Sequence, residues 1–109
     1  MNGLHDLSYV FGGLFLANAV PHIASGMMGR PFQSPFAKPP GKGLSSSTVN
    51  VVWGFVNLVV AYGLIVRVGQ FDIRAWDQIA SLGFGLLLMG VFAARTFGRY
   101  HGGNTPAGS

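Results

Sequence analysis

The chain has 109 residues, of which 50% are hydrophobic and 9% are charged. A water-soluble domain usually carries about 25% charged residues, so this composition excludes an ordinary soluble enzyme, and the high hydrophobicity excludes a disordered chain. The formal net charge of +4 comes from a few basic residues outside long apolar runs, which favours contact with anionic membrane lipids over nucleic acid. The absence of cysteine excludes disulfides and thiolate metal sites.

Three uncharged segments divide the chain. Residues 7–29, 43–66 and 78–94 contain 23, 24 and 17 consecutive residues without a formal charge. A helix needs roughly 17–25 largely apolar residues to cross a bilayer, and only helices and closed barrels satisfy their backbone groups in lipid. Strict apolar and polar alternation does not occur in these segments, which favours helices. The sequence therefore predicts an all-α integral membrane protein, with three transmembrane helices in a single domain at residues 1–109.

The first predicted helix, at about residues 7–29, carries a polar face. Positions spaced by three and four residues lie on the same side of a helix, and here they form a stripe of Asn18, His22, Ser25 and Gly26. Pro21 lies beside this stripe and has no N–H to donate to the carbonyl of Ala17. Polar groups at membrane depth face a partner or a cavity, so we expect the stripe to point into the bundle.

The predicted cytoplasmic loop at residues 30–47 is rich in proline and in basic residues. Its four prolines remove backbone donors and block a helix, so extended or turned chain is expected. The repeated dipeptides Pro31-Phe32 and Pro35-Phe36 favour a linker that lies along the membrane interface. A partner-docking or re-entrant element is the alternative for this loop.

The second predicted helix, at about residues 48–67, offers a matching face. Ser45–Thr48 supply N-cap candidates. Small and polar residues again follow helical spacing, in a row of Asn50, Gly54, Asn57 and Ala61. An antiparallel hairpin of the first two helices brings the two polar faces together in one register. The predicted pairs are Asn18 with Asn57, His22 with Trp53 and Gly54, and Ser25 with Asn50.

The third predicted helix, at about residues 76–97, follows an outer loop at residues 68–75, where Asp72 is the N-cap candidate. Small residues four positions apart let helices approach closely, and Ser81 and Gly85 have this spacing. Residues 98–109 are expected to form a flexible tail because of their composition. The residues expected to pack the helices together are Gly54, Asn50, Ser25, Gly26, Ser81, Gly85 and Gly90.

The distribution of basic residues predicts the topology, because cytoplasmic flanks carry an excess of Lys and Arg. Only Arg67 and Arg74 lie in the loop between the second and third helices. Five others lie on the opposite side of the membrane: Arg30, Lys38, Lys42, Arg95 and Arg99. We therefore expect the N-terminus outside and the C-terminus in the cytoplasm of a bacterial inner membrane, with those five side chains at lipid headgroups.

Motifs of catalysis and nucleotide binding are missing from the sequence. It contains no H-E-x-x-H or G-x-S-x-G motif, and no carboxylate lies inside an uncharged segment. Gly41-Lys42-Gly43 does not match a phosphate-binding loop, which needs Ser or Thr directly after the lysine. A proton-coupled or cation-coupled carrier normally uses a buried acid. We therefore expect a protein that is not an enzyme, without catalytic or metal-cluster residues.

Three functional hypotheses fit the polar face. The first is a structural or accessory subunit, as a homo-oligomer or in a larger membrane complex, with Asn18, His22 and Asn57 as interhelical hydrogen-bonding groups. The second is a binding protein that uses these side chains for haem, a quinone or a metal, since neutral imidazole is a common ligand. The third is an oligomeric transporter or channel lined by the same residues. His5 and His101 lie beyond the helix ends and are not expected to join His22.

Overall fold

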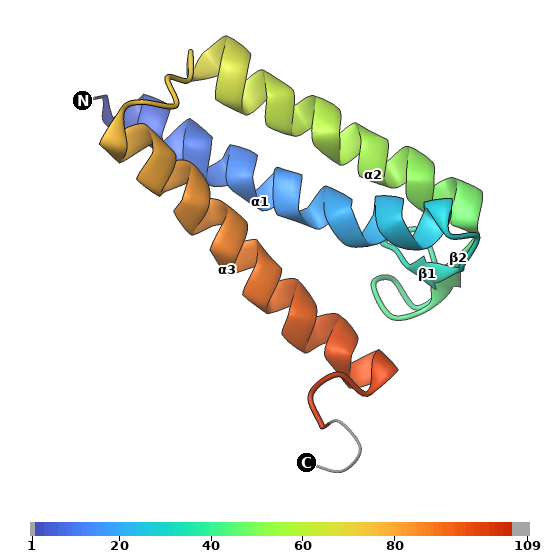
Figure 1. Cartoon of the computed structure of the whole chain (residues 1–109). Coiled ribbons are helices and arrows are strands. Elements are labelled where there is room, and N and C mark those ends of the chain that lie inside the picture. Colours follow the sequence, from blue (N-terminus) through green and yellow to red (C-terminus); the bar gives the residue numbers. More distant parts are fainter. Residues whose placement is uncertain (1, 106–109) are drawn as a thin grey trace.

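Within residues 2–105, which the computed structural model describes, three long helices are joined by a folded loop and a short turn (Figure 1). The helices are α1 (Gly3–Met27), α2 (Ser47–Tyr62), which continues as the π-helical segment η1 (Gly63–Val68), and α3 (Trp76–His101). The described residues thus contain three helical segments that are long and apolar enough to cross a membrane. This confirms the predicted mostly helical chain with three potential spans.

The helix ends follow local capping chemistry. α1 begins four residues before the predicted span because the side-chain Oδ1 of Asn2 accepts hydrogen bonds from the backbone N–H groups of Leu4 and His5, at 3.0 and 3.2 Å. α3 continues to His101 and ends at Gly102, whose φ of 77° suits glycine at a helix C-terminus. Part of the predicted tail is therefore helical, and its residues 106–109 lie outside the described residues.

The two predicted N-caps have different outcomes. Ser46, one of the candidates, caps α2 by accepting a hydrogen bond from the N–H of Val49 at 3.2 Å. The prediction for Asp72 is wrong: its carboxylate accepts from the N–H of Arg74 at 3.0 Å inside the connecting turn. α3 begins after Ala75 without a side-chain cap. Asp72 is therefore used to close the turn that leads into the helix.

The loop between α1 and α2 folds back against the bundle as a small antiparallel hairpin of β1 (Phe32–Gln33) and β2 (Leu44–Ser45). Its register pairs Phe32 with Ser45 and Gln33 with Leu44. Phe32, Gln33 and Ser34 are buried, so this part of the loop is a packed element and not an extended linker along the interface. Prolines predicted non-helical chain, but no sequence pattern indicated that the segment pairs with itself.

α1 lies between α2 and α3 and packs against both (Figure 1). Near the start of α1, glycines bring backbones into direct contact: a Cβ atom at Gly13 would meet the backbone of Leu82 and Gly85, and one at Gly85 would meet the carbonyl of Val10. Toward Met27 and His101, α1 and α3 diverge (Figure 1). The hairpin packs at this wider end, where β1 contacts α1 and α2.

Candidate ligand site around His22

His22 lies where α1, β1, α2 and α3 meet, and its side chain is only 2% exposed. Its imidazole packs edge-on against three aromatic rings, at centroid distances of 5.6 Å to Phe32, 6.4 Å to Trp53 and 6.1 Å to Phe97. Edge-to-face packing of this kind favours one ring orientation. The elements around His22 therefore hold the imidazole in a defined position.

A hydrogen bond to Asn50 fixes which ring nitrogen of His22 carries the proton. The Oδ1 atom of the fully buried Asn50 lies 2.7 Å from Nδ1 of His22. The Nδ2 group of Asn50 donates to the backbone carbonyls of Phe32, Ser45 and Ser46, at 3.0, 3.2 and 3.1 Å. Because the amide N–H₂ is used by carbonyls, the amide oxygen faces the imidazole and accepts the Nδ1 proton. Nε2 of the neutral ring is then an unprotonated acceptor.

Nε2 of His22 has no hydrogen-bond partner within residues 2–105. Among the described side-chain polar atoms that are wholly buried, those without a partner are Asp6 Oδ1 and Trp53 Nε1. Nε2 is therefore not wholly buried, and the residue His22 lines a cavity of about 380 Å³. We call this space the His22 cavity. Other side chains in its wall are Asn18, Gln33, Trp53, Phe92 and Phe97.

A second polar chain supports the wall of the His22 cavity. Asn18 donates from Nδ2 to Oδ1 of Asn57 at 3.0 Å, and Asn57 donates from its own Nδ2 to the carbonyl of Trp53 at 2.8 Å. This forms the Asn18–Asn57 pair that the hairpin register predicts. The indole Nε1 of Trp53 is nevertheless left without an acceptor in the described part of the chain. An unprotonated acceptor and an unsatisfied donor thus belong to two side chains that line the same cavity.

A neighbouring space, which we call the apolar cavity, lies between α1 and α3 and has a volume of about 470 Å³. The side chains that line it are all apolar, among them Leu16, Val20, Pro21 and Leu86. Phe97 lines both this cavity and the His22 cavity, whereas Phe32 lines only the apolar cavity. The wide end of the bundle therefore combines a space with polar side chains and a purely apolar one, and the ring of Phe97 belongs to the wall of both.

The remaining helix-packing predictions meet different surroundings. A Cβ atom at Gly54 would lie 3.0 Å from the backbone nitrogen of Ile23, and one at Gly26 would lie 3.0 Å from that of Val51, so both glycines permit close α1–α2 contact. Ser81 donates to the carbonyl of Asp77 in its own helix at 2.7 Å. Gly90 has open space at its Cβ position and lines the apolar cavity.

One pairing of the predicted register is replaced. Asn50 bonds to His22, whereas the register paired it with Ser25. The reason is the folded loop, because Asn50 Nδ2 bonds to carbonyls of β1 and β2 and this turns its oxygen toward the imidazole. Ser25 is only half-buried. The five basic residues expected at lipid headgroups, Arg30, Lys38, Lys42, Arg95 and Arg99, are all exposed.

His101 comes closer to His22 than the sequence suggested. Its ring stacks on Phe32 at a centroid distance of 5.4 Å, and its Nε2 lies 2.9 Å from Oε1 of Gln33. The two histidines thus contact the same phenyl ring without meeting. Sequence reasoning did not assign Phe32, Phe97 or Gln33 to the site, and it treated the Pro31-Phe32 dipeptide only as part of a linker along the membrane interface.

The donor set of the site decides what it can hold. Within residues 2–105, no group of three or more His, Asp or Glu residues is placed to bind a metal ion. The His22 cavity offers one imidazole acceptor, amide groups and aromatic surfaces, which suit a neutral organic molecule. Comparison of the chain with protein-family models, with curated proteins and with solved structures gives no match.

Proposed function

We propose that this chain is a multi-pass membrane protein that binds a lipid-soluble organic molecule through Nε2 of His22. The observation that carries the proposal is a buried histidine whose Nδ1 is held by Asn50, whose Nε2 has no partner in the described residues, and which lines a cavity among potential membrane spans. Ligand sites are typically apolar spaces with a few convergent polar groups. A volume of about 380 Å³ lies within the usual range for small-molecule sites.

Among the ligands that the sequence suggested, the donor set favours an organic molecule of the quinone class over a metal or haem. A catalytic zinc site uses three protein ligands, and the His22 cavity supplies one imidazole. Haem iron bound by two histidines would need His22 from two copies, because His101 stacks on Phe32 and bonds to Gln33. A neutral head group that donates a hydrogen bond needs only one acceptor, and Nε2 of His22 is such an acceptor.

Tryptophan fluorescence tests the proposal directly. Trp76 is 86% exposed at the far end of α3, so Trp76→Phe leaves Trp53 as the sole tryptophan, in the wall of the cavity. Titration of this variant in lipid nanodiscs with tail-free trimethylhydroquinone should quench Trp53 saturably. Adding His22→Gln keeps a donor for Asn50 and should weaken binding about tenfold, as expected when one hydrogen bond worth about 1.4 kcal/mol is lost.

A matched control separates binding from partition into lipid. Trp53→Phe retains only Trp76, which reports quencher that has entered the bilayer away from the cavity. Its quenching should be linear and unaffected by His22→Gln. Identical concentration dependence of Trp53 quenching with and without His22→Gln would contradict the proposal.

A subunit role is the second candidate function, and it is supported by the surface of α3. This helix is the least buried of the three potential spans, and a Cβ atom at Gly83 or Gly90 would meet no other atom within 4 Å. Small residues of this kind permit close approach of a helix from another subunit. The mass of the purified protein in detergent tests this role, since a single copy without a partner would contradict it.

We also propose that the N-terminus lies outside and the C-terminus in the cytoplasm of a bacterial inner membrane. The five exposed basic residues on the predicted cytoplasmic side support this orientation. Because the native chain has no cysteine, single cysteines report topology without background. Asn2→Cys should react with an impermeant thiol reagent in intact cells, whereas Asn104→Cys should be protected. The reverse pattern would invert the topology.

A further inference from the structure

We infer that the molecule bound at His22 is an amphipathic phenol or hydroquinone, with its ring hydroxyl in the His22 cavity and its apolar tail in the apolar cavity. This inference rests on the proposed function and adds the chemical class of the ligand. It follows from the acceptor that Nε2 of His22 offers and from the ring of Phe97, which lines both cavities.

The polar atoms select a hydroxyl. Nε2 of His22 accepts a hydrogen bond, because Nδ1 already donates to Asn50. Nε1 of Trp53 also lacks a partner in the described residues, but this atom is wholly buried and is not open to a molecule in the cavity. A hydroxyl oxygen donates its own proton and accepts another, whereas a quinone carbonyl only accepts.

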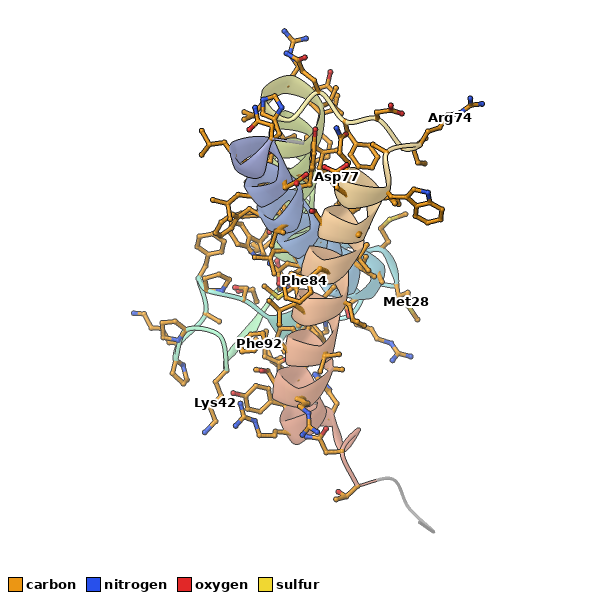
Figure 2. All side chains as sticks on the ribbon, turned by 90° about the vertical axis from the view of Figure 1, so that its left-hand side faces the viewer. Met28, Lys42, Arg74, Asp77, Phe84 and Phe92 are labelled. Atoms are coloured by element: carbon orange, nitrogen blue, oxygen red, sulfur yellow. The ribbon has the colours of Figure 1, made fainter. Side chains whose placement is uncertain are left out.

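The aromatic walls suit the ring that carries such a hydroxyl. Phe97 lines both cavities, and Phe32, which packs edge to face on Phe97 at 4.7 Å, lines the apolar cavity. A phenol ring beside His22 would meet these rings in the offset or edge-on geometries that aromatic groups prefer. Figure 2 places Phe92, another wall residue, in the half of the molecule that holds Lys42, away from Arg74.

The adjacent apolar cavity suits a tail. It is lined only by apolar residues of α1, α3 and β1, and it shares the ring of Phe97 with the His22 cavity. Burial of each methylene in such surroundings strengthens binding about fourfold. A ligand with a hydroxyl at one end and a hydrocarbon chain at the other therefore matches both spaces, whereas a small polar molecule matches only one.

The test fills the apolar cavity and leaves the His22 cavity unchanged. Gly90→Leu places a side chain in open space along the apolar cavity, so it should enter without displacing a helix. Gly83→Leu is the matched control, since its Cβ also meets open space on α3 but Gly83 lines neither cavity. Each change is combined with Trp76→Phe, and Trp53 quenching gives dissociation constants for trimethylhydroquinone with and without a decyl tail.

Gly90→Leu should weaken binding of the decyl compound tenfold or more, because displacing two methylenes from the cavity corresponds to about that factor. The dissociation constant of the tail-free compound should change by less than about twofold, because this compound has no tail to place in the apolar cavity. Gly83→Leu should leave both unchanged. Equal affinity of the decyl compound in the Gly90→Leu and Gly83→Leu proteins would overturn the tail assignment, while His22-dependent binding of the tail-free compound would still support the proposed function.

The oxidised compound tests the hydroxyl assignment. The wild-type site should bind the decyl hydroquinone about tenfold more tightly than the matching quinone, which lacks the proton that Nε2 accepts. His22→Gln should remove most of this preference. Equal or tighter binding of the quinone to the wild-type site would overturn the assignment. Failure of every compound to bind in a His22-dependent manner would instead contradict the proposed function itself.

Discussion

The two ends of the α1–α3 contact are built in opposite ways. At the end where α1 begins, Gly13 and Gly85 bring backbone against backbone, and a Cβ at either position would collide with the facing helix. At the other end the same helices diverge (Figure 1). Aromatic rings, the buried amide of Asn50 and two cavities formed by described residues lie at that end. Close packing at one end and a lined space at the other occur along one helix pair.

This difference shows how a small bundle can hold a site. Tyr9, which is fully buried, also donates its hydroxyl proton to the carbonyl of Gly69 at the tight end, so α1 is tied to the turn before α3. The wide end is closed by the α1–α2 loop, whose backbone is held by Asn50. Glycine contacts therefore set where the helices meet, and a polar network determines what lies between them where they separate.

The largest expected effect comes from adding one methyl group at the tight end. Gly85→Ala would place a Cβ against the carbonyl of Val10 and force α1 and α3 apart. Overpacking of this kind costs about 1–3 kcal/mol, and we expect the upper part of that range in the free energy of unfolding, measured in mixed micelles. Gly83→Ala is the control: its Cβ meets open space, so it should be neutral or stabilise by up to about 1 kcal/mol. Equal changes in the free energy of unfolding for Gly85→Ala and Gly83→Ala would show that the backbones of α1 and α3 are not in contact at the tight end.

The next effect belongs to the polar network of the wide end. Asn50→Leu removes the bond to His22 and leaves the carbonyls of Phe32, Ser45 and Ser46 with one partner fewer. Loss of a buried hydrogen-bond partner lowers the free energy of unfolding by about 1–3 kcal/mol. The hydrogen-exchange rates of the backbone amides in the α1–α2 loop should rise as well. A stable Asn50→Leu protein with unchanged loop exchange would mean that Asn50 does not hold the hairpin.

A smaller effect is expected at Asn18. Its single hydrogen bond to Asn57 joins α1 and α2 at the edge of the His22 cavity. Interhelical hydrogen bonds in membranes contribute about 0.6 kcal/mol on average, so Asn18→Leu should lower the unfolding free energy by less than Asn50→Leu does. A larger loss than for Asn50→Leu would reverse the ranking of the two polar pairs.

The smallest stability effect is expected for His22 itself. His22→Gln supplies a new N–H for Asn50 Oδ1 and retains a side chain in the aromatic surroundings, so the unfolding free energy should change by less than about 1 kcal/mol. Binding of the hydroquinone should nevertheless weaken. A loss of stability as large as that of Asn50→Leu would indicate that His22 is mainly a structural residue.

Charge spacing and helical periodicity were enough to predict the potential spans and the facing asparagines. The 23-residue and 24-residue uncharged runs became α1 and the α2–η1 segment, and Asn18 meets Asn57 as expected. The partner of Asn50 was not predictable from helix register, because it depends on loop carbonyls that reach Asn50 only after the hairpin folds back. Phe32 and His101 joined the site for the same reason.

The most direct test of the account is the protonation of the two ring nitrogens of His22. Solid-state nitrogen NMR of histidine-labelled protein in bilayers distinguishes a nitrogen that carries a proton from one that does not, and the signals of His22 are identified by their loss in His22→Gln. We predict that Nδ1 carries a proton and is hydrogen-bonded to Asn50. We also predict that Nε2 is unprotonated and that its nitrogen resonance shifts when hydroquinone is added. A proton on Nε2 in the neutral ring would contradict the account, because the site would then offer a donor and could not accept a hydroxyl.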